Sequence, residues 1–317
     1  MPSPILVISH THDIHAIEVL GHLARRGADA VLFDTGRLPR ETRLTIAHDP
    51  LHDWRGAAQF DGRTLDMAAI RAAWWRRPQP FAVHAELGGP ADQGFAVAET
   101  HAAVSGLWSL LDARWINDPD ADDRAARKAW QLKLARQAGL RIPRTCMTND
   151  PDAARAFIAA EPGRVIYKAF SATEQLWRET RVLNADEATG LDAVRYAPVI
   201  FQEYIAGTCD LRVTIVGSRV FAASITASAG AYEYDFRVSM GDVTIAAHDL
   251  PAPIERALLA LMAALGLVYG AIDLRLTPGG DYVFLEINPA GQWLFVEHVT
   301  GQPIGAAIAD VLVGWAV

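Results

Sequence analysis

The last third of the chain contains the segment Gly270-Ala-Ile-Asp273-Leu-Arg-Leu-Thr-Pro-Gly-Gly-Asp-Tyr-Val-Phe-Leu-Glu286-Ile-Asn288-Pro. Apolar residues on both sides of the Pro-Gly-Gly turn predict two strands that form a hairpin. Because side chains alternate along a strand, Asp273 faces away from its apolar neighbours, and Glu286 and Asn288 share one face of the partner strand. The three polar side chains are therefore expected to converge on one side of the hairpin.

This convergence predicts a metal site. Two carboxylates opposed across a ladder repel each other, so a cation is expected between them. Carboxylate and amide oxygens suit Mg²⁺, which completes its shell with water and substrate phosphate. Asp273, Glu286 and Asn288 are therefore predicted metal ligands, with Leu285 on the opposite, apolar face. The alternative is a solvated hairpin on which Arg275 neutralises Asp273.

Two lysines upstream are candidate phosphate contacts. Lys168 lies in the apolar strand Val165–Phe170, where a cation needs an anion or a route to solvent. Its alternative is a lysine that extends to water at a strand end. Lys128 falls early in a helix predicted over Asp122–Ala138, where the alternative is an ordinary exposed lysine.

A second set of polar residues follows the predicted buried strand before position 202. The run Gln202-Glu203-Tyr204-Ile205 turns polar abruptly and offers backbone groups to an adenine edge. Asp210 and Arg212 follow on one face of the next strand, where an acid suits ribose hydroxyls and an arginine suits phosphate. A solvated Asp210–Arg212 pair is the alternative. Asp235-Phe236-Arg237 adds another arginine within the polar stretch Ala231–Met240.

The composition of the chain and the order of its predicted helices and strands indicate the class of protein. The chain has 317 residues, about half of them apolar, and a formal net charge of −8, which argues against broad nucleic-acid binding. The two cysteines lack metal-ligand spacing, and no signal peptide or membrane-spanning stretch is recognised, which predicts a cytoplasmic protein that does not enter membranes. A βαβ opening and later mixed elements predict an α/β protein with lobes at 1–116, 117–205 and 206–317.

In combination these features resemble the ATP-grasp superfamily. The carrying elements occur in order along the chain: Lys128 before Gly139-Leu140-Arg-Ile-Pro143-Arg-Thr145, then Lys168, Gln202-Glu203-Tyr204-Ile205, Asp210, and the Asp273, Glu286, Asn288 set. The resemblance implies an ATP-grasp fold with an N-terminal pre-ATP-grasp βαβ domain. It implies ATP and Mg²⁺ as cofactors, with ATP bound by Lys128, Lys168, residues 202–205, Asp210 and Arg212.

Within the superfamily the chain is most similar to the RimK-like branch and, within it, to graspetide (microviridin-type) peptide maturases. The carrying segments are Trp74-Trp75-Arg76-Arg77-Pro78, Asn149-Asp150-Pro151, Asp210-Leu211-Arg212-Val213-Thr214, Tyr269-Gly270-Ala271-Ile272-Asp273-Leu274-Arg275 and Asn288-Pro289-Ala290-Gly291-Gln292-Trp293. This resemblance implies a ligase that activates Asp or Glu side chains of a precursor peptide as acyl phosphates. Thr, Ser or Lys side chains then close ω-ester or ω-amide rings. A leader segment of the peptide docks on the enzyme, and a homodimer is suggested.

The resemblance also implies roles for individual side chains. Arg212 and Arg237 stabilise developing charge, and Asp235, Glu233 and His298 remain open as general bases. Arg76 and Arg77 are candidates to meet acidic peptide side chains. The stretch Ala169–Thr173 lacks the glycines that many ATP-grasp enzymes carry after the strand lysine, so Ser171 and Thr173 are candidate phosphate contacts.

Two other functions stay open. One is a RimK-like ligase that adds a free amino acid to a peptide or metabolite, and the other is a non-catalytic nucleotide-binding module.

Overall fold

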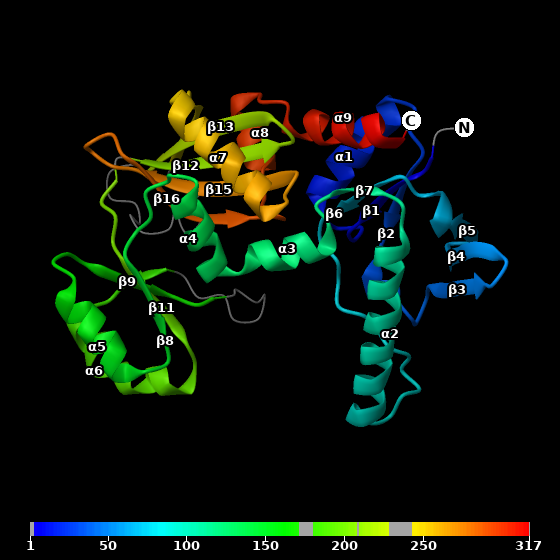
Figure 1. Ribbon diagram of the computed structural model, residues 1–317, viewed down its shortest axis with the longest axis horizontal. Coiled ribbons are helices and arrows are strands. Elements are labelled where there is room, and N and C mark those ends of the chain that lie inside the picture. The colour runs from blue at the N-terminus through cyan, green and yellow to red at the C-terminus, as the bar shows by residue number, and fades with distance from the viewer. Residues whose placement is uncertain (1–2, 171–179, 208, 228–242, 317) are drawn as a thin grey trace.

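The computed structural model describes residues 3–170, 180–207, 209–227 and 243–316. An N-terminal parallel sheet has the strand order β2-β1-β6-β7, which confirms the predicted βαβ opening (Figure 1). Its elements are β1 (Ile5–Ile8), α1 (Ile14–Arg25), β2 (Ala30–Phe33), β6 (Ala72–Trp75), α2 (Pro90–Leu110) and β7 (Arg114–Ile116). Asp13 caps α1 by accepting a hydrogen bond from the His15 amide.

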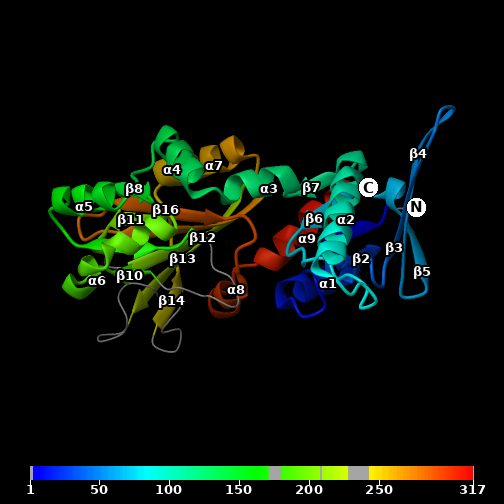
Figure 2. The ribbon, with the colours of Figure 1, turned by 90° about the horizontal axis from the view of Figure 1, so that it is seen from below.

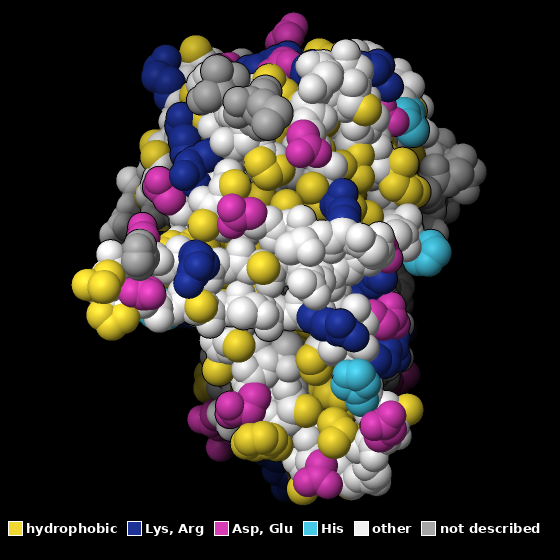
Figure 3. Space-filling view, turned by 90° about the vertical axis from the view of Figure 1, so that its right-hand side faces the viewer, with side chains coloured by type: hydrophobic (Ala, Val, Ile, Leu, Met, Phe, Trp, Pro, Cys, Tyr) yellow, Lys and Arg dark blue, Asp and Glu magenta, His cyan; other side chains and the backbone are white. Residues whose placement is uncertain are grey.

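A separate antiparallel sheet of three strands extends from this domain: β3 (Arg43–Asp49), β4 (His52–Phe60) and β5 (Arg63–Asp66). Asp61 and Gly62 form the turn between β4 and β5, and both have a positive φ, of 50° and 71°. On the face of the molecule seen in Figure 3, basic side chains are interspersed with acidic ones among the described residues. That face therefore presents no continuous basic surface.

The central part of the chain forms a small four-stranded sheet in the order β10-β9-β11-β8. Its elements are β8 (Thr145–Thr148), α5 (Pro151–Ala160), β9 (Val165–Lys168), β10 (Arg181–Val182), α6 (Ala185–Thr189) and β11 (Val199–Glu203). A 3₁₀ helix, Leu191–Tyr196, and α5 cover one face, where Phe201 and Val165 are buried. The opposite face carries Thr145, Lys168 and Gln202, because side chains alternate along each strand.

The third lobe is built on a five-stranded antiparallel sheet in the order β14-β13-β12-β15-β16. Its elements are β12 (Cys209–Val216), β13 (Arg219–Ala227), β14 (Val243–Ala247), α7 (Ala252–Leu265), β15 (Tyr269–Leu276), β16 (Tyr282–Asn288), α8 (Leu294–Thr300) and α9 (Ile304–Ala316). Helices α7 and α4 (Lys128–Gln137) cover one face of this sheet (Figure 2). Helix α9 packs against α1, so the N-terminal domain and this lobe share one apolar core.

One predicted helix is divided in the structure. The helix expected over Asp122–Ala138 is two helices, α3 (Pro119–Ala126) and α4, which separate at Arg127. Arg127 has an extended backbone, with φ −73° and ψ 105°, and this ends α3 and starts α4. The break places Lys128 at the first position of α4. Within the described residues, no helix combines the length and the apolar character needed to cross a membrane.

Candidate functional site

The predicted carboxylate pair is formed across β15 and β16. Asp273 is the direct partner of Glu286 in the antiparallel register, as the hairpin predicts. The register then shifts at a bulge between Asp273 and Leu274, so that Leu274 pairs with Phe284. The prediction that Leu285 shares the apolar face is wrong, because the bulge places Phe284 in the core instead and leaves Leu285 half-buried.

Each carboxylate of the pair has its own cationic partner. Lys128 Nζ lies 2.7 Å from Glu286 Oε2, and each side chain is 18 % exposed. Arg212 Nη1 donates to Asp273 Oδ1 at 2.7 Å, across β12 and β15. Asn288 completes the group by donating from Nδ2 to Glu286 Oε1 at 3.2 Å. The three predicted metal ligands and two predicted phosphate contacts therefore lie together on one face of the sheet.

Electrostatics keep Glu286 ionised. Burial alone would raise the pKa of Glu286, but the charges of Lys128 and Lys168 and the hydrogen bonds from Lys128 and Asn288 lower it to about 2. Lys168 comes from the central sheet and Lys128 from α4, which packs on the C-terminal sheet, so cations from two elements act on one carboxylate. A carboxylate with a lowered pKa and hard oxygen neighbours fits Mg²⁺, and the basic side chains around it fit phosphate.

The metal set itself contains two carboxylates and one amide. Among the residues that the structure describes, no group of three or more His, Cys, Asp and Glu side chains could hold a metal ion. Two carboxylates and one amide would supply only part of the shell of Mg²⁺ and would leave positions for phosphate and water. This is the way Mg²⁺ binds with nucleotides.

The predicted adenine hinge lies at the end of β11. The side chains of Gln202 and Glu203 are already engaged: Gln202 Nε2 donates to Thr145 Oγ1 at 2.9 Å, and Glu203 Oε2 accepts from the Arg144 amide at 3.0 Å. These bonds fix the start of β8 against the hinge. The amides of Glu203 and Tyr204 are engaged as well, because each donates at 2.9 Å to a carbonyl, of Arg144 and of Arg164 respectively.

Asp210 is paired with Arg275, whereas the sequence suggested Arg212 as its partner. Its Oδ1 lies 3.2 Å from Arg275 Nε, while Arg212 reaches Asp273. In the described part of the chain, Arg275 therefore pairs with Asp210, and Arg212 pairs with Asp273. Arg275 also lies 5.8 Å from the centre of the Tyr204 ring, so it connects the hinge to the C-terminal sheet.

Several candidates lie elsewhere or cannot be placed. Asp235, Glu233, Arg237, Ser171 and Thr173 lie outside the described residues. His298 is exposed on α8, whose Phe295 ring lies 5.8 Å from the Arg212 guanidinium carbon. The expectation that Arg76 meets acidic peptide side chains is wrong, because Arg76 is 1 % exposed and bonds to Asp13 and to backbone carbonyls of another lobe.

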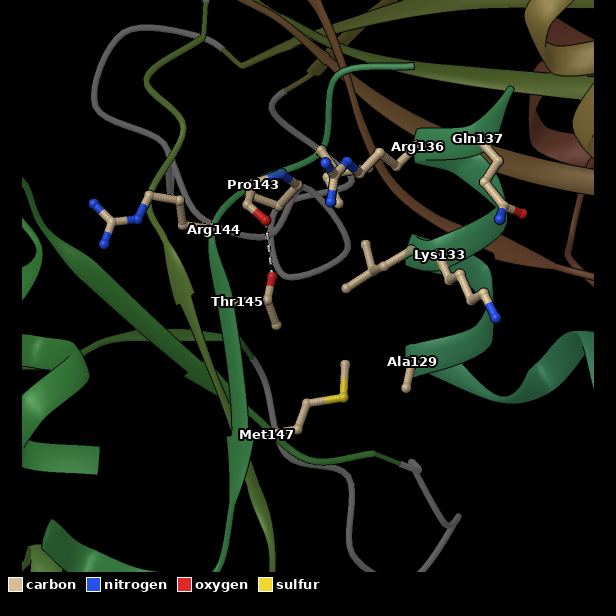
Figure 4. A pocket seen from close by; sticks show the side chains of 10 residues that line it. Ala129, Lys133, Arg136, Gln137, Pro143, Arg144, Thr145 and Met147 are labelled. Atoms are coloured by element: carbon tan, nitrogen blue, oxygen red, sulfur yellow. Dashed lines mark hydrogen bonds between the residues drawn. The ribbon is translucent and has the colours of Figure 1, made fainter. Parts of the chain in front are cut away.

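A cavity of about 940 Å³ lies between α4 and β8. Its lining is largely apolar with a basic component: Ala129, Leu132, Lys133, Arg136, Gln137, Ile142, Pro143, Arg144, Thr145 and Met147. Figure 4 shows Arg136 reaching from α4 across the cavity towards Pro143, with Met147 pointing in from β8 and Arg144 turned away. Through Thr145, which bonds Gln202, and Ala129, which follows Lys128, the cavity adjoins the candidate nucleotide site.

The fold and the site define an ATP-grasp enzyme, with a carboxylate hairpin and lysines from α4 and β9. The RimK-like ATP-grasp domain matches residues 125–312, and the MvdD pre-ATP grasp domain matches residues 4–123. The chain belongs to the RimK-like ATP-grasp family and is a ligase of that family. A curated relative, "Ribosomal protein bS6--L-glutamate ligase" of Salmonella paratyphi B, is 31% identical over 67% of this chain and 71% of its own.

Solved structures resemble the chain over its full length. The macrocyclase MdnC bound with precursor peptide MdnA, from Microcystis aeruginosa MRC, has a TM-score of 0.87 at 29% identity and covers 98% of this chain and 99% of its own. A Chryseobacterium gregarium RiPP-associated ATP-grasp ligase, in complex with ADP, a leader and a core peptide, has 0.88 at 28%, covering 98% and 97%. The ligase PsnB, complexed with a precursor variant, Mg and ADP, has 0.79 at 25%, with complete coverage of both chains.

Proposed function

We propose that this ligase macrocyclises a ribosomal precursor peptide. The observation that carries the proposal is the Asp273–Glu286–Asn288 group, set between Lys128, Lys168 and Arg212. This group is equipped to hold a nucleotide triphosphate beside a carboxylate. The full-length likeness to MdnC, which is bound with a precursor peptide, favours a peptide as the owner of that carboxylate.

The proposed reaction has two steps. An Asp or Glu side chain of the peptide attacks the γ-phosphorus of ATP, and an acyl phosphate and ADP form. A Thr or Ser hydroxyl or a Lys amine of the same peptide then attacks the acyl carbon, loses its proton, and expels inorganic phosphate. The product is an ω-ester or ω-amide ring. Neither step needs a covalent enzyme intermediate, so the protein acts by positioning and charge stabilisation.

The described residues take the following parts. Asp273, Glu286 and Asn288 would hold Mg²⁺, which when bound neutralises charge on the phosphate oxygens. Lys128 of α4 and Lys168 of β9 hold phosphate oxygens, and Arg212 stabilises charge that develops near Asp273. Asp210 is proposed for the ribose, and the hinge Gln202-Glu203-Tyr204-Ile205 is proposed for adenine. Arg237 and Asp235 remain proposed catalytic residues from outside the described ranges.

The cavity between α4 and β8 is the proposed place for a segment of the precursor peptide. Arg136 extends into it and belongs to no ion pair among the described residues, so it suits an acidic peptide side chain. Ile142, Pro143 and Met147 offer apolar contacts beside it. An acidic and apolar segment held there lies next to the nucleotide site.

A second candidate function is addition of a free amino acid, which the glutamate-ligase relatives favour. The chemistry at the metal is the same, and the two functions differ in the nucleophile. A third, a non-catalytic nucleotide-binding module, is disfavoured because the metal set is complete and paired with cations. The homodimer, the cytoplasmic location and the lobe boundaries stay predictions.

The test uses purified enzyme, ATP, Mg²⁺ and a candidate peptide, with and without free glutamate. A macrocyclase forms ADP with the peptide alone, and added glutamate does not raise the rate. ADP formation that requires both the peptide and glutamate would assign the amino-acid ligase instead. ADP formation with no peptide dependence would contradict both.

A further inference from the structure

Arg76 is a buried cation of the N-terminal domain that contacts the hairpin carrying the proposed metal ligands. It follows β6 and is 1 % exposed. Its Nε donates to Asp13 Oδ2 at 3.0 Å, and its Nη1 donates to the carbonyl oxygens of Ala290 at 2.5 Å and Gly291 at 2.9 Å. These two carbonyls belong to the turn that directly follows Asn288. Arg76 therefore holds the backbone beside a proposed metal ligand.

The turn after Asn288 is tightly closed. The Gly291 amide donates to the Asn288 carbonyl at 3.1 Å. A Cβ atom on Gly291 would lie 2.3 Å from Ala271 Cβ, which a folded protein does not accommodate. The turn has no room to shift towards β15, and Arg76 holds it from the other side.

Other buried side chains hold the same stretch of backbone. Each binds a peptide group between residues 287 and 291: Gln131 to Ile287 at 2.8 and 3.2 Å, Asn117 to the Pro289 carbonyl at 3.0 Å, and the Tyr269 hydroxyl to the Gly291 carbonyl at 2.8 Å. Arg76 differs from these three because it carries a charge. Its counter-ion, Asp13, also accepts from the Ser9 hydroxyl at 2.8 Å, so the pair is fixed on both sides.

We propose that Arg76 is a positioning residue for the metal site, acting through the turn of residues 288–291. The inference rests on the proposed metal set. With the turn fixed, the Asn288 amide and the Glu286 carboxylate are held in one arrangement before a metal ion arrives. Groups that orient metal ligands affect metal affinity about 10- to 100-fold when they are changed. Arg76 also links the N-terminal domain to nucleotide binding.

The test measures binding of ADP by calorimetry, with and without Mg²⁺, and so needs no peptide. Arg76→Lys keeps the charge beside Asp13 but loses the planar group that reaches two carbonyls. We expect it to weaken ADP binding about ten-fold in the presence of Mg²⁺ and to leave metal-free ADP binding unchanged. Arg71→Lys is the control, because Arg71 is exposed at the other end of β6 and its side chain donates to the nearby carbonyls of Ala68 and Ile70.

A double variant, Arg76→Met with Asp13→Asn, removes both charges of the buried pair and so leaves no unpaired buried charge that could unfold the protein. A loss of binding in this variant then reports a displaced turn at residues 288–291. We expect it to show the same Mg²⁺-specific loss. Wild-type affinity in the folded variants, or an equal loss with and without Mg²⁺, would overturn the inference. Wild-type enzyme that binds ADP with Mg²⁺ yet modifies no peptide would instead refute the proposed function and leave the role of Arg76 standing.

Discussion

The ammonium group of Lys128 lies 2.7 Å from the carboxylate of Glu286, although the two residues are 158 positions apart. Lys128 starts α4, and Glu286 lies in β16 of the C-terminal lobe. The pair places a cation beside a carboxylate that is proposed to hold Mg²⁺. A bound metal ion and phosphate would share these groups, with Lys128 turning to the phosphate oxygens.

Lys128→Met should raise the pH midpoint of acid unfolding. The folded pKa of Glu286 is depressed to about 2, so its stabilising contribution is present above its usual pKa of 4.5 and disappears as pH falls through 2. Without Lys128, burial raises this pKa, and the loss begins at higher pH. Circular dichroism between pH 6 and pH 2 measures the midpoint. Lys133→Met, on the exposed face of α4, should leave the midpoint unchanged; equal midpoints for all three proteins would refute the assignment.

Glu286→Gln and Asp273→Asn should each reduce ADP formation by more than about 100-fold, because a metal ligand contributes at least as much as the groups that orient it. Both substitutions keep the shape of the side chain, so the fold should be retained, although Glu286→Gln should lower the thermal midpoint because it leaves Lys128 without its ionised partner. A coupled assay of ADP release measures the effect. Substantial turnover in both variants would remove the metal assignment.

Asp122→Asn should change how stability depends on pH. Burial raises the pKa of Asp122 to about 7, against the lowering effects of Asn117 and Arg76. A raised carboxyl pKa means that the folded state binds more protons than the unfolded state between pH 3.8 and 7, so stability falls as pH rises through this window. The loss is roughly 2 to 4 kcal/mol. Urea unfolding at pH 5 and pH 8 should show a smaller difference for the variant; an identical difference would contradict the shift.

Arg136→Glu should weaken peptide binding and spare nucleotide binding. The substitution places an acid in the cavity between α4 and β8, where it would repel an acidic peptide segment. We expect the peptide concentration for half-maximal ADP formation to rise about ten-fold, which is the effect of losing one exposed charge pair and gaining repulsion. Arg141→Glu, on an exposed arginine beyond α4, is the control. An unchanged peptide requirement would exclude the cavity as the peptide site.

The sequence predicted the parts of the site that follow local periodicity. Asp273 and Glu286 face each other because strand alternation and one turn determine their placement. Leu285 was misplaced because a bulge inserts one residue, and nothing in the run Tyr282–Asn288 marks it. The break at Arg127 was missed for a similar reason, since no glycine or proline interrupts the helical pattern there.

The long-range polar contacts could not be predicted from the sequence. Gln131, a polar residue within the apolar face of α4, was a signal that a buried partner existed, but not that the partner was Ile287. Arg76 was read as a surface cation because its partners, Asp13 and the turn after Asn288, belong to distant segments that only the packed domains bring together.

The central claim is that the activated carboxylate and its acceptor belong to one peptide. The most direct measurement is the intact mass of short peptides encoded beside this gene, each co-expressed with the wild-type chain or with Glu286→Gln. We expect a peptide to lose one water per ring with the wild-type chain and to stay unchanged with the variant. A peptide that gains the mass of an amino-acid residue, or peptides that all stay unchanged with the wild-type chain, would contradict the account.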